Sequence, residues 1–112
     1  MTREHILITN AAPDRVLAVI DAALSEPHET LADRIVVGDN ETLVEVYEHD
    51  YETDEAVPFE QFPTAVDAFS PRRDRDDDGR ARANALLGRL ARALQAADIE
   101  VRVVDDLERL VP

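Results

Sequence analysis

Hydrophobic residues recur along the chain at two different periods, and these periods predict helices and strands. Between Val16 and Leu24, and again between Ala83 and Ala97, apolar residues return every three or four positions, which is typical of one buried helix face. Around residues 42–48 and 99–103 apolar and polar residues alternate, which indicates strands with one buried face. The expected elements are a strand at 5–9, a helix from Pro13 that ends before Pro27, strands at 34–37 and 42–48, a helix at 80–97 and a strand at 99–103.

This order of elements predicts a fold class. Strand, helix, strand, strand, helix, strand is the ferredoxin-like βαββαβ pattern. We therefore expect one α+β domain over residues 1–112, in which two helices cover one face of a four-stranded antiparallel sheet. A long irregular insertion at about 49–79, acidic and charged, separates the third strand from the second helix. We expect only a helical turn at 28–33 and a short helix at 63–69.

The acidic residues are concentrated in the middle of the chain. The whole sequence has a formal net charge of −13, yet residues 35–71 alone hold ten carboxylates, no Lys or Arg, and every aromatic residue. The segments on either side are nearly balanced in charge. A strongly negative protein is repelled by DNA, RNA and anionic membranes. The distribution therefore predicts a surface that recognises something basic, although adaptation to salt is another explanation of the acidity.

Aromatic and acidic residues together suggest a protein-binding surface. Tyrosine supplies a buried anchor at an interface, and surrounding carboxylates pair with Lys and Arg of a basic partner. The three phenylalanines of the segment are expected to fold back onto the core instead. The predicted partner-binding residues are Glu45, Tyr47, Glu48, Asp50, Tyr51, Glu52, Asp54 and Glu55.

One short segment matches the beginning of a calcium-binding loop. Asp74, Asp76 and Asp78 alternate as the first ligands of an EF-hand do, and a glycine follows them. The ninth and twelfth positions of such a loop would be Arg82 and Ala85, a cation and a methyl group in place of oxygen ligands. The sequence therefore favours a solvated loop, and we predict no metal and no cofactor.

Motifs for catalysis are missing from the sequence. The chain has no cysteine and only three glycines, and neither Ser25 nor Ser70 lies in a Gly-x-Ser-x-Gly turn. No two histidines stand four residues apart, and His49 beside Asp50 is expected to be an exposed strand-end histidine. We predict that the protein is not an enzyme.

The sequence also bears on localisation. The absence of cysteine fits a reducing compartment, and no apolar run reaches the length of a signal peptide or a membrane span. We expect a cytoplasmic protein.

Three hypotheses of function follow. The first is an immunity or antitoxin protein that neutralises a basic partner such as a toxin nuclease. In size, charge and class the chain is similar to barstar-type inhibitors, which implies that kind of partner. The second is a homodimeric ferredoxin-like small-molecule-binding protein or enzyme, with a pocket on the open face of the sheet. The third is an inhibitor whose carboxylates imitate DNA phosphates. Residues expected to line the face in the second hypothesis are Leu7, Val36, Leu43, Tyr47 and Val104.

Overall fold

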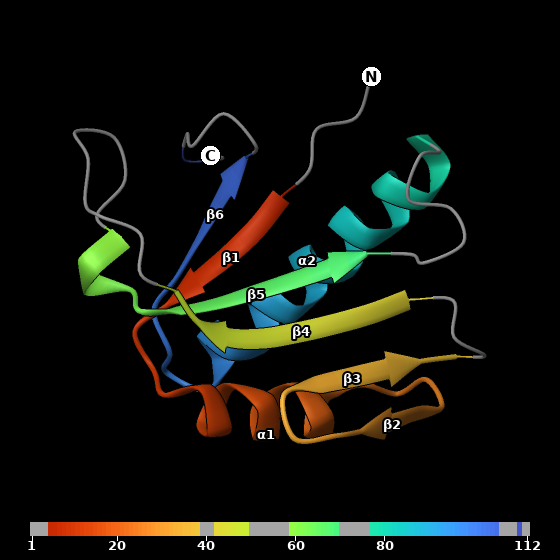
Figure 1. The fold of residues 1–112 in the computed structure, drawn as a ribbon, viewed down its shortest axis with the longest axis horizontal. Helices are drawn as coiled ribbons and strands as arrows, with labels where there is room; N and C mark the ends of the chain where they lie inside the picture. The colour runs from red at the N-terminus through yellow and green to blue at the C-terminus, as the bar shows by residue number, and fades with distance from the viewer. Residues whose placement is uncertain (1–4, 39–41, 50–58, 70–76, 106–109, 111–112) are drawn as a thin grey trace.

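Two helices and a six-stranded antiparallel sheet make up the part of the chain that the computed structural model describes, residues 5–38, 42–49, 59–69, 77–105 and 110 (Figure 1). The strands lie in the order β2-β3-β4-β5-β1-β6, so β2 and β6 are the edges of the sheet. The elements are β1 (His5–Thr9), α1 (Pro13–Ala23), β2 (His28–Thr30), β3 (Arg34–Val37), β4 (Thr42–Glu48), the 3-10 turn η1 (Phe59–Gln61), β5 (Thr64–Phe69), α2 (Asp77–Ala96) and β6 (Val101–Asp105).

Helix α1 forms where the sequence predicts it. Pro13 occupies the start of the helix, where its fixed φ suits the first turn and its missing N–H costs nothing, and Asp14 follows in that turn. Val16 and Ile20, one turn apart, are fully buried against the sheet. The helix ends at Ala23, four residues before Pro27.

Helix α2 supplies the largest apolar stripe. Its buried side chains recur at helical spacing, and its end is defined by a backbone motif. Asp98 adopts a positive φ of 63°, its N–H donates to the Gln95 carbonyl, and the N–H of Ile99 donates to the Leu94 carbonyl. These two bonds make a Schellman motif, with aspartate at the position where glycine is usual. The buried stripe is Ala83, Leu86, Leu87, Leu90, Ala91 and Leu94.

Both helices pack on the same face of the sheet. Leu7, Val44 and Val66 point toward the helices and belong to the main hydrophobic core, together with Val16 of α1 and Leu90 of α2. Helix α2 lies behind the central strands in Figure 1, and α1 lies beside it. Alternate residues of each strand point to the opposite face, which neither helix covers.

A smaller hydrophobic cluster lies on that opposite face. Ile8, Phe62 and Val104 are buried together there, and Ile6 packs against them. Phe62 comes from the segment between η1 and β5, and its ring is 3% exposed. The expectation that phenylalanines fold onto the core is therefore met by Phe62.

The predicted four-stranded ferredoxin-like sandwich is wrong, because the sheet has six strands. Two segments were expected to be helical and are strands: 28–33 contains β2, and 63–69 contains β5. The predicted α+β class and the two predicted amphipathic helices agree with the structure. The last strand also begins two residues later than expected, at Val101, since the motif that ends α2 extends to Ile99.

Strand β5 has a sequence without a clear strand pattern. It reads Thr-Ala-Val-Asp-Ala-Phe, with two alanines and no alternation of apolar and polar residues. Between β4 and β1 it hydrogen-bonds on both sides, and both of its faces are partly or fully buried. Pairing and packing within the sheet, rather than a local pattern, thus define this strand. Its position in the middle of the sheet also displaces β4 away from β1.

Membrane insertion through a helix is not indicated. Among the described residues, neither α1 nor α2 is both long and apolar enough to cross a bilayer.

The central position of β5 leads to a prediction about stability. Val66 is fully buried among the core residues of β1, β4 and the helices, whereas Val36 on β3 is half-buried on the uncovered face. We expect Val66→Ala to lower the free energy of unfolding by about 2–3 kcal/mol, and Val36→Ala by less than about 1 kcal/mol. Urea denaturation of both variants measures the difference. Equal losses for the two valines contradict the placement of β5.

Candidate protein-binding face

The register of the sheet places three rows of side chains on the face that the helices leave uncovered, called the open face below. Leu43 pairs with Val36 on one side and with Phe69 on the other, which gives an apolar row across β3, β4 and β5. The next row along the strands is Arg34, Glu45 and Asp67, the polar row. All six side chains are half-buried. The third row contains Tyr47, Ala65, Ile8 and Arg102.

The polar row has an excess of negative charge. Glu45 lies between Arg34 and Asp67, so both of its cross-strand neighbours on this face are charged. The Arg34 guanidinium donates from Nε to Asp33 Oδ1 at 3.1 Å. The Asp33 carboxylate is the main reason that the pKa of Arg34 is raised, and nearby Glu45 adds to it. Like charges directly opposite each other across two strands are unfavourable. The pairing of Glu45 with Asp67 therefore concentrates negative charge in this row.

Part of the open face is closed by the protein itself. Phe62 covers Ile8 and Val104, and the Arg102 guanidinium lies 5.2 Å from the centre of its ring. His49 holds this segment in place: its backbone N–H donates to the Pro63 carbonyl, and its Nε2–H donates to the Phe62 carbonyl. These bonds tie the end of β4 to the segment that precedes β5. The apolar and polar rows lie on the half of the open face beyond this cluster.

The structure tests the placement of only some predicted site residues. Glu45 and Tyr47 lie on the open face as alternation requires, whereas Glu48 points to the opposite side and is exposed. Five predicted binding residues, Asp50, Tyr51, Glu52, Asp54 and Glu55, lie outside the described residues.

The weak metal candidates are placed in part. Asp74 and Asp76 lie outside the described residues, and Asp78 lies in the first turn of α2. Helical backbone therefore begins at Asp77, where an EF-hand loop would continue as far as Ala85. Among the described residues, no group of three metal-ligating side chains occurs.

Several residues of the open face were missed or misassigned by sequence reasoning. Asp67 and Phe69 join this face only because β5 is a strand. Val36 and Leu43 are on it, as the small-molecule hypothesis assumed, but Leu7 points into the core beneath the helices. No sequence signal distinguishes the two faces of β1, because Ile6, Leu7 and Ile8 are all apolar.

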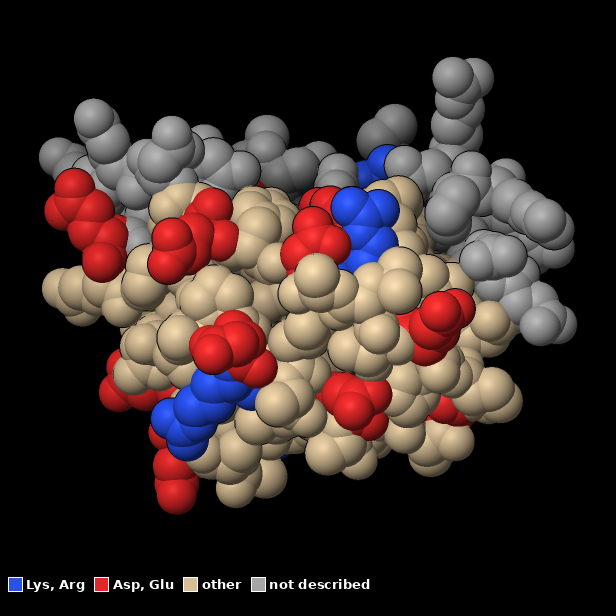
Figure 2. Space-filling model, turned by 60° about the horizontal axis from the view of Figure 1, so that its bottom comes forward, with Lys and Arg blue, Asp and Glu red and all other residues tan. Residues whose placement is uncertain are grey.

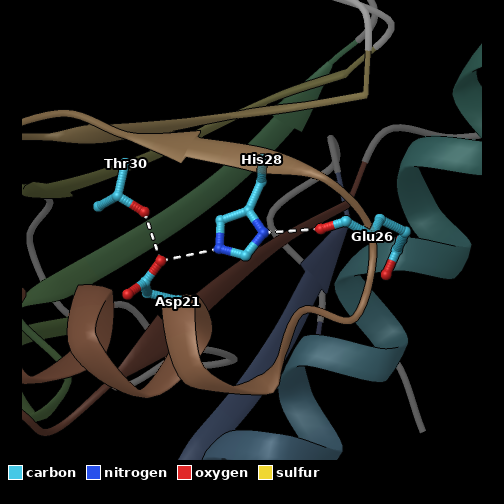
Figure 3. Close-up of polar contacts among 4 residues, drawn as sticks. All are labelled: Asp21, Glu26, His28 and Thr30. Atoms are coloured by element: carbon cyan, nitrogen blue, oxygen red, sulfur yellow. Dashed lines mark hydrogen bonds and ion pairs between the residues drawn. The ribbon is translucent and has the colours of Figure 1, made fainter.

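A polar cluster ties β2 to α1 on the helix side of the sheet (Figure 3). The Asp21 carboxylate on α1 accepts hydrogen bonds from His28 Nε2, at 2.8 Å, and from the Thr30 hydroxyl, at 2.6 Å. His28 Nδ1 lies 2.7 Å from the Glu26 backbone carbonyl. Both ring nitrogens of His28 therefore face acceptors. Neither is left to take a proton from a nucleophile, so this Asp–His pair is not arranged as a catalytic dyad.

The charged groups of this cluster shift each other's pKa. The Glu26 carbonyl and then the Asp21 carboxylate raise the pKa of His28. The hydrogen bonds from Thr30 and His28 lower the pKa of Asp21. The folded protein therefore favours the His28 imidazolium beside the Asp21 carboxylate.

A cavity of about 400 Å³ lies next to this cluster, between α2 and the start of β4. Its floor includes Val37 and Leu86, and Arg82, Arg89 and Glu26 stand at its rim. Glu26 and Arg89 form an ion pair there, which lowers the pKa of Glu26. The Arg89 guanidinium at this rim is thus neutralised by the Glu26 carboxylate.

Carboxylates on the face that α1 and β2 share are spread out. Figure 2 shows separate acidic groups among neutral side chains there, with few cationic ones between them. On this side of the molecule the described carboxylates therefore do not form one continuous acidic patch.

The fold and the open face together define an α+β protein whose six-stranded antiparallel sheet carries helices on one face and presents an apolar row beside carboxylates on the other. No protein-family model matches the chain, and neither curated proteins nor solved structures show a significant match to it.

The part of the open face that Phe62 covers leads to a second prediction about stability. Replacement of the buried Phe62 by alanine exposes Ile8 and Val104, so we expect Phe62→Ala to lower the free energy of unfolding by about 3–5 kcal/mol. Leu110, which is 42% exposed near the same face, is the control. Leu110→Ala is expected to cost less than about 0.5 kcal/mol. Denaturant titration monitored by circular dichroism distinguishes the two, and a small loss for Phe62→Ala places that ring outside the core.

Proposed function

We propose that the protein is a small binding module of the immunity or antitoxin type, which neutralises a basic partner such as a toxin nuclease through its open sheet face. The observation that carries this proposal is the adjacency of two rows on that face. The half-buried apolar row of Val36, Leu43 and Phe69 lies directly beside Glu45 and Asp67. An apolar centre with polar groups at its margin is the usual anatomy of a protein interface.

The overall charge supports a basic partner. At −13, the protein attracts cationic surfaces over long range, which accelerates their encounter. A nuclease is cationic where it holds phosphates, so an acidic protein that occupies this surface also excludes its substrate. The half-buried Glu45 carboxylate is suited to meet a Lys or Arg of such a partner.

The same charge disfavours a homodimer through this face. Two copies that dock face to face bring two chains of −13 together and place Glu45 and Asp67 of each near identical groups. A DNA mimic remains a related alternative, since it differs only in the normal ligand of the target. Competition between duplex DNA and the protein for the isolated partner identifies that case. We also propose a cytoplasmic location, which the absence of cysteine supports.

The experiment begins with capture of a partner from cells of the encoding organism on the immobilised full chain, followed by purification of that partner. Titration calorimetry then gives the dissociation constant over a range of salt concentrations. We expect a basic partner and an affinity that falls as salt rises, because the charged surfaces are screened. A neutral or acidic partner whose affinity ignores salt contradicts the proposal.

Matched variants locate the interface. Leu43→Ala removes the centre of the apolar row and is expected to weaken binding about tenfold or more. Leu31→Ala is its control, because Leu31 is 45% exposed in the turn between β2 and β3. Glu45→Gln is expected to weaken binding roughly two- to tenfold at low salt, and exposed Glu100→Gln should change it far less. If each control weakens binding as much as its counterpart, the open face is not the interface.

A further inference from the structure

The hydrogen bonds of His28 determine which charge state of its ring fits the folded protein. Nε2 faces the Asp21 carboxylate at 2.8 Å and Nδ1 faces the Glu26 carbonyl at 2.7 Å. Both partners are oxygen acceptors, so each nitrogen must carry a proton to make its bond. Only the doubly protonated imidazolium satisfies both contacts. A neutral ring turns one bare nitrogen toward an oxygen and loses that hydrogen bond.

We propose that Asp21, His28 and Thr30 form a pH-sensitive latch, which holds the edge strand β2 against α1 while His28 is protonated and loosens it when His28 loses its proton. Two of the three latch residues, His28 and Thr30, are themselves two of the three residues of β2 (Figure 3). The third, Asp21, lies on α1 and contacts both. This device goes beyond the proposed function and does not depend on it.

Strand β2 has little else to hold it. It is three residues long, it pairs only with β3, and none of its side chains is fully buried. A short edge strand without buried apolar side chains belongs to the least stable part of a fold, where local opening is frequent. Loss of one latch hydrogen bond is therefore expected to change how often β2 opens.

The charged groups around His28 come from three elements. Asp21 faces it from α1, and Glu26 faces it from the preceding loop through its carbonyl. The Glu26 carboxylate is itself bound by Arg89 of α2. From β3 the residue opposite His28 is the uncharged Val37, and Glu29 of β2 points to the other face of the sheet.

The direction in which pH affects the latch follows from the pKa shifts of His28 and Asp21. The pKa of His28 is raised above 6.5, so its contribution is complete below about 6.5 and is lost as pH rises through the folded value. The pKa of Asp21 is lowered below 3.8, so its contribution is complete above about 3.8 and is lost only as pH falls through the folded value. The latch is therefore closed in mildly acidic solution and loosens on the alkaline side.

Release of β2 changes the edge of the sheet. The backbone groups of β3 that pair with β2 become accessible, and β3 also carries Val36 and Arg34 on the open face. An uncovered strand edge readily pairs with another extended chain.

Hydrogen exchange on the full chain tests the latch. Two backbone bonds flank β2: the N–H of Leu31 donates to Arg34, and the N–H of Gly38 donates to Pro27, both at 2.8 Å. We expect the protection factors of these two amides to fall roughly two- to fivefold between pH 5.5 and 8.5, as for an exposed ion pair that is lost. The midpoint should coincide with the titration of His28, followed by the ¹⁵N shifts of its ring. The amide of Leu24, bonded to Ile20 within α1, should show no such step.

Variants separate the latch from a general effect of pH. His28→Gln still offers a donor to Asp21 but does not titrate, so its Leu31 and Gly38 amides should lack the step. Asp21→Asn should lower the pKa of His28, and His5→Gln on β1 should leave the step unchanged. The latch is ruled out if His28 is already neutral at pH 6, if wild-type protection is constant with pH, or if His28→Gln keeps the step.

Discussion

The pairing of β5 with β4 on one side and β1 on the other is the constraint on which the rest of the structure depends. It places Val66 opposite both Val46 and Leu7, on the side of the helices. In the same register Asp67 comes opposite Glu45, on the open face. A shift by one residue would send Val66 to the open face and Asp67 into the core. Burial of Val66 and exclusion of the Asp67 carboxylate therefore fix the register, and the register in turn builds the open face.

How much of this fold the sequence predicts depends on whether an element carries its own hydrophobic pattern. The stripe of α2 and the alternation of β4 are visible in the sequence, and both elements form where expected. Strand β5 lacks such a pattern because alanines lie on both of its faces, Ala65 on the open face and Ala68 on the helix side. Strand β2 has no apolar residue at all. Both require tertiary contacts to be recognised, and the ferredoxin-like prediction is wrong because it omits them.

The residues of the candidate site also differ in whether the sequence alone could identify them. Glu45 and Tyr47 were assigned to one face by alternation within β4, and the structure agrees. Glu48 was grouped with them because it is close in sequence, although its position in the strand turns it to the other side. Asp67 and Phe69, which complete the polar and apolar rows, are adjacent to β4 only through the pairing of β5. Closeness along an acidic segment is thus a poor guide to closeness on a sheet, where neighbours two residues apart share a face and neighbours one residue apart do not.

The centre of the sheet and its β2 edge are held by different kinds of interaction, and we expect this difference to determine how each responds to pH. At the centre, β5, β1 and β4 are held by burial of Leu7, Val44 and Val66 under the helices, which does not depend on protonation. At the edge, β2 is held by its pairing with β3 and by side-chain hydrogen bonds to Asp21, and the bond from His28 depends on the charge of its imidazole. Under the proposed latch, the β2 edge responds to the charge of His28, whereas the burial that holds the central strands does not involve that charge. Since β3 lies between that edge and the apolar row, the conditional part of the sheet borders the face proposed to bind a partner.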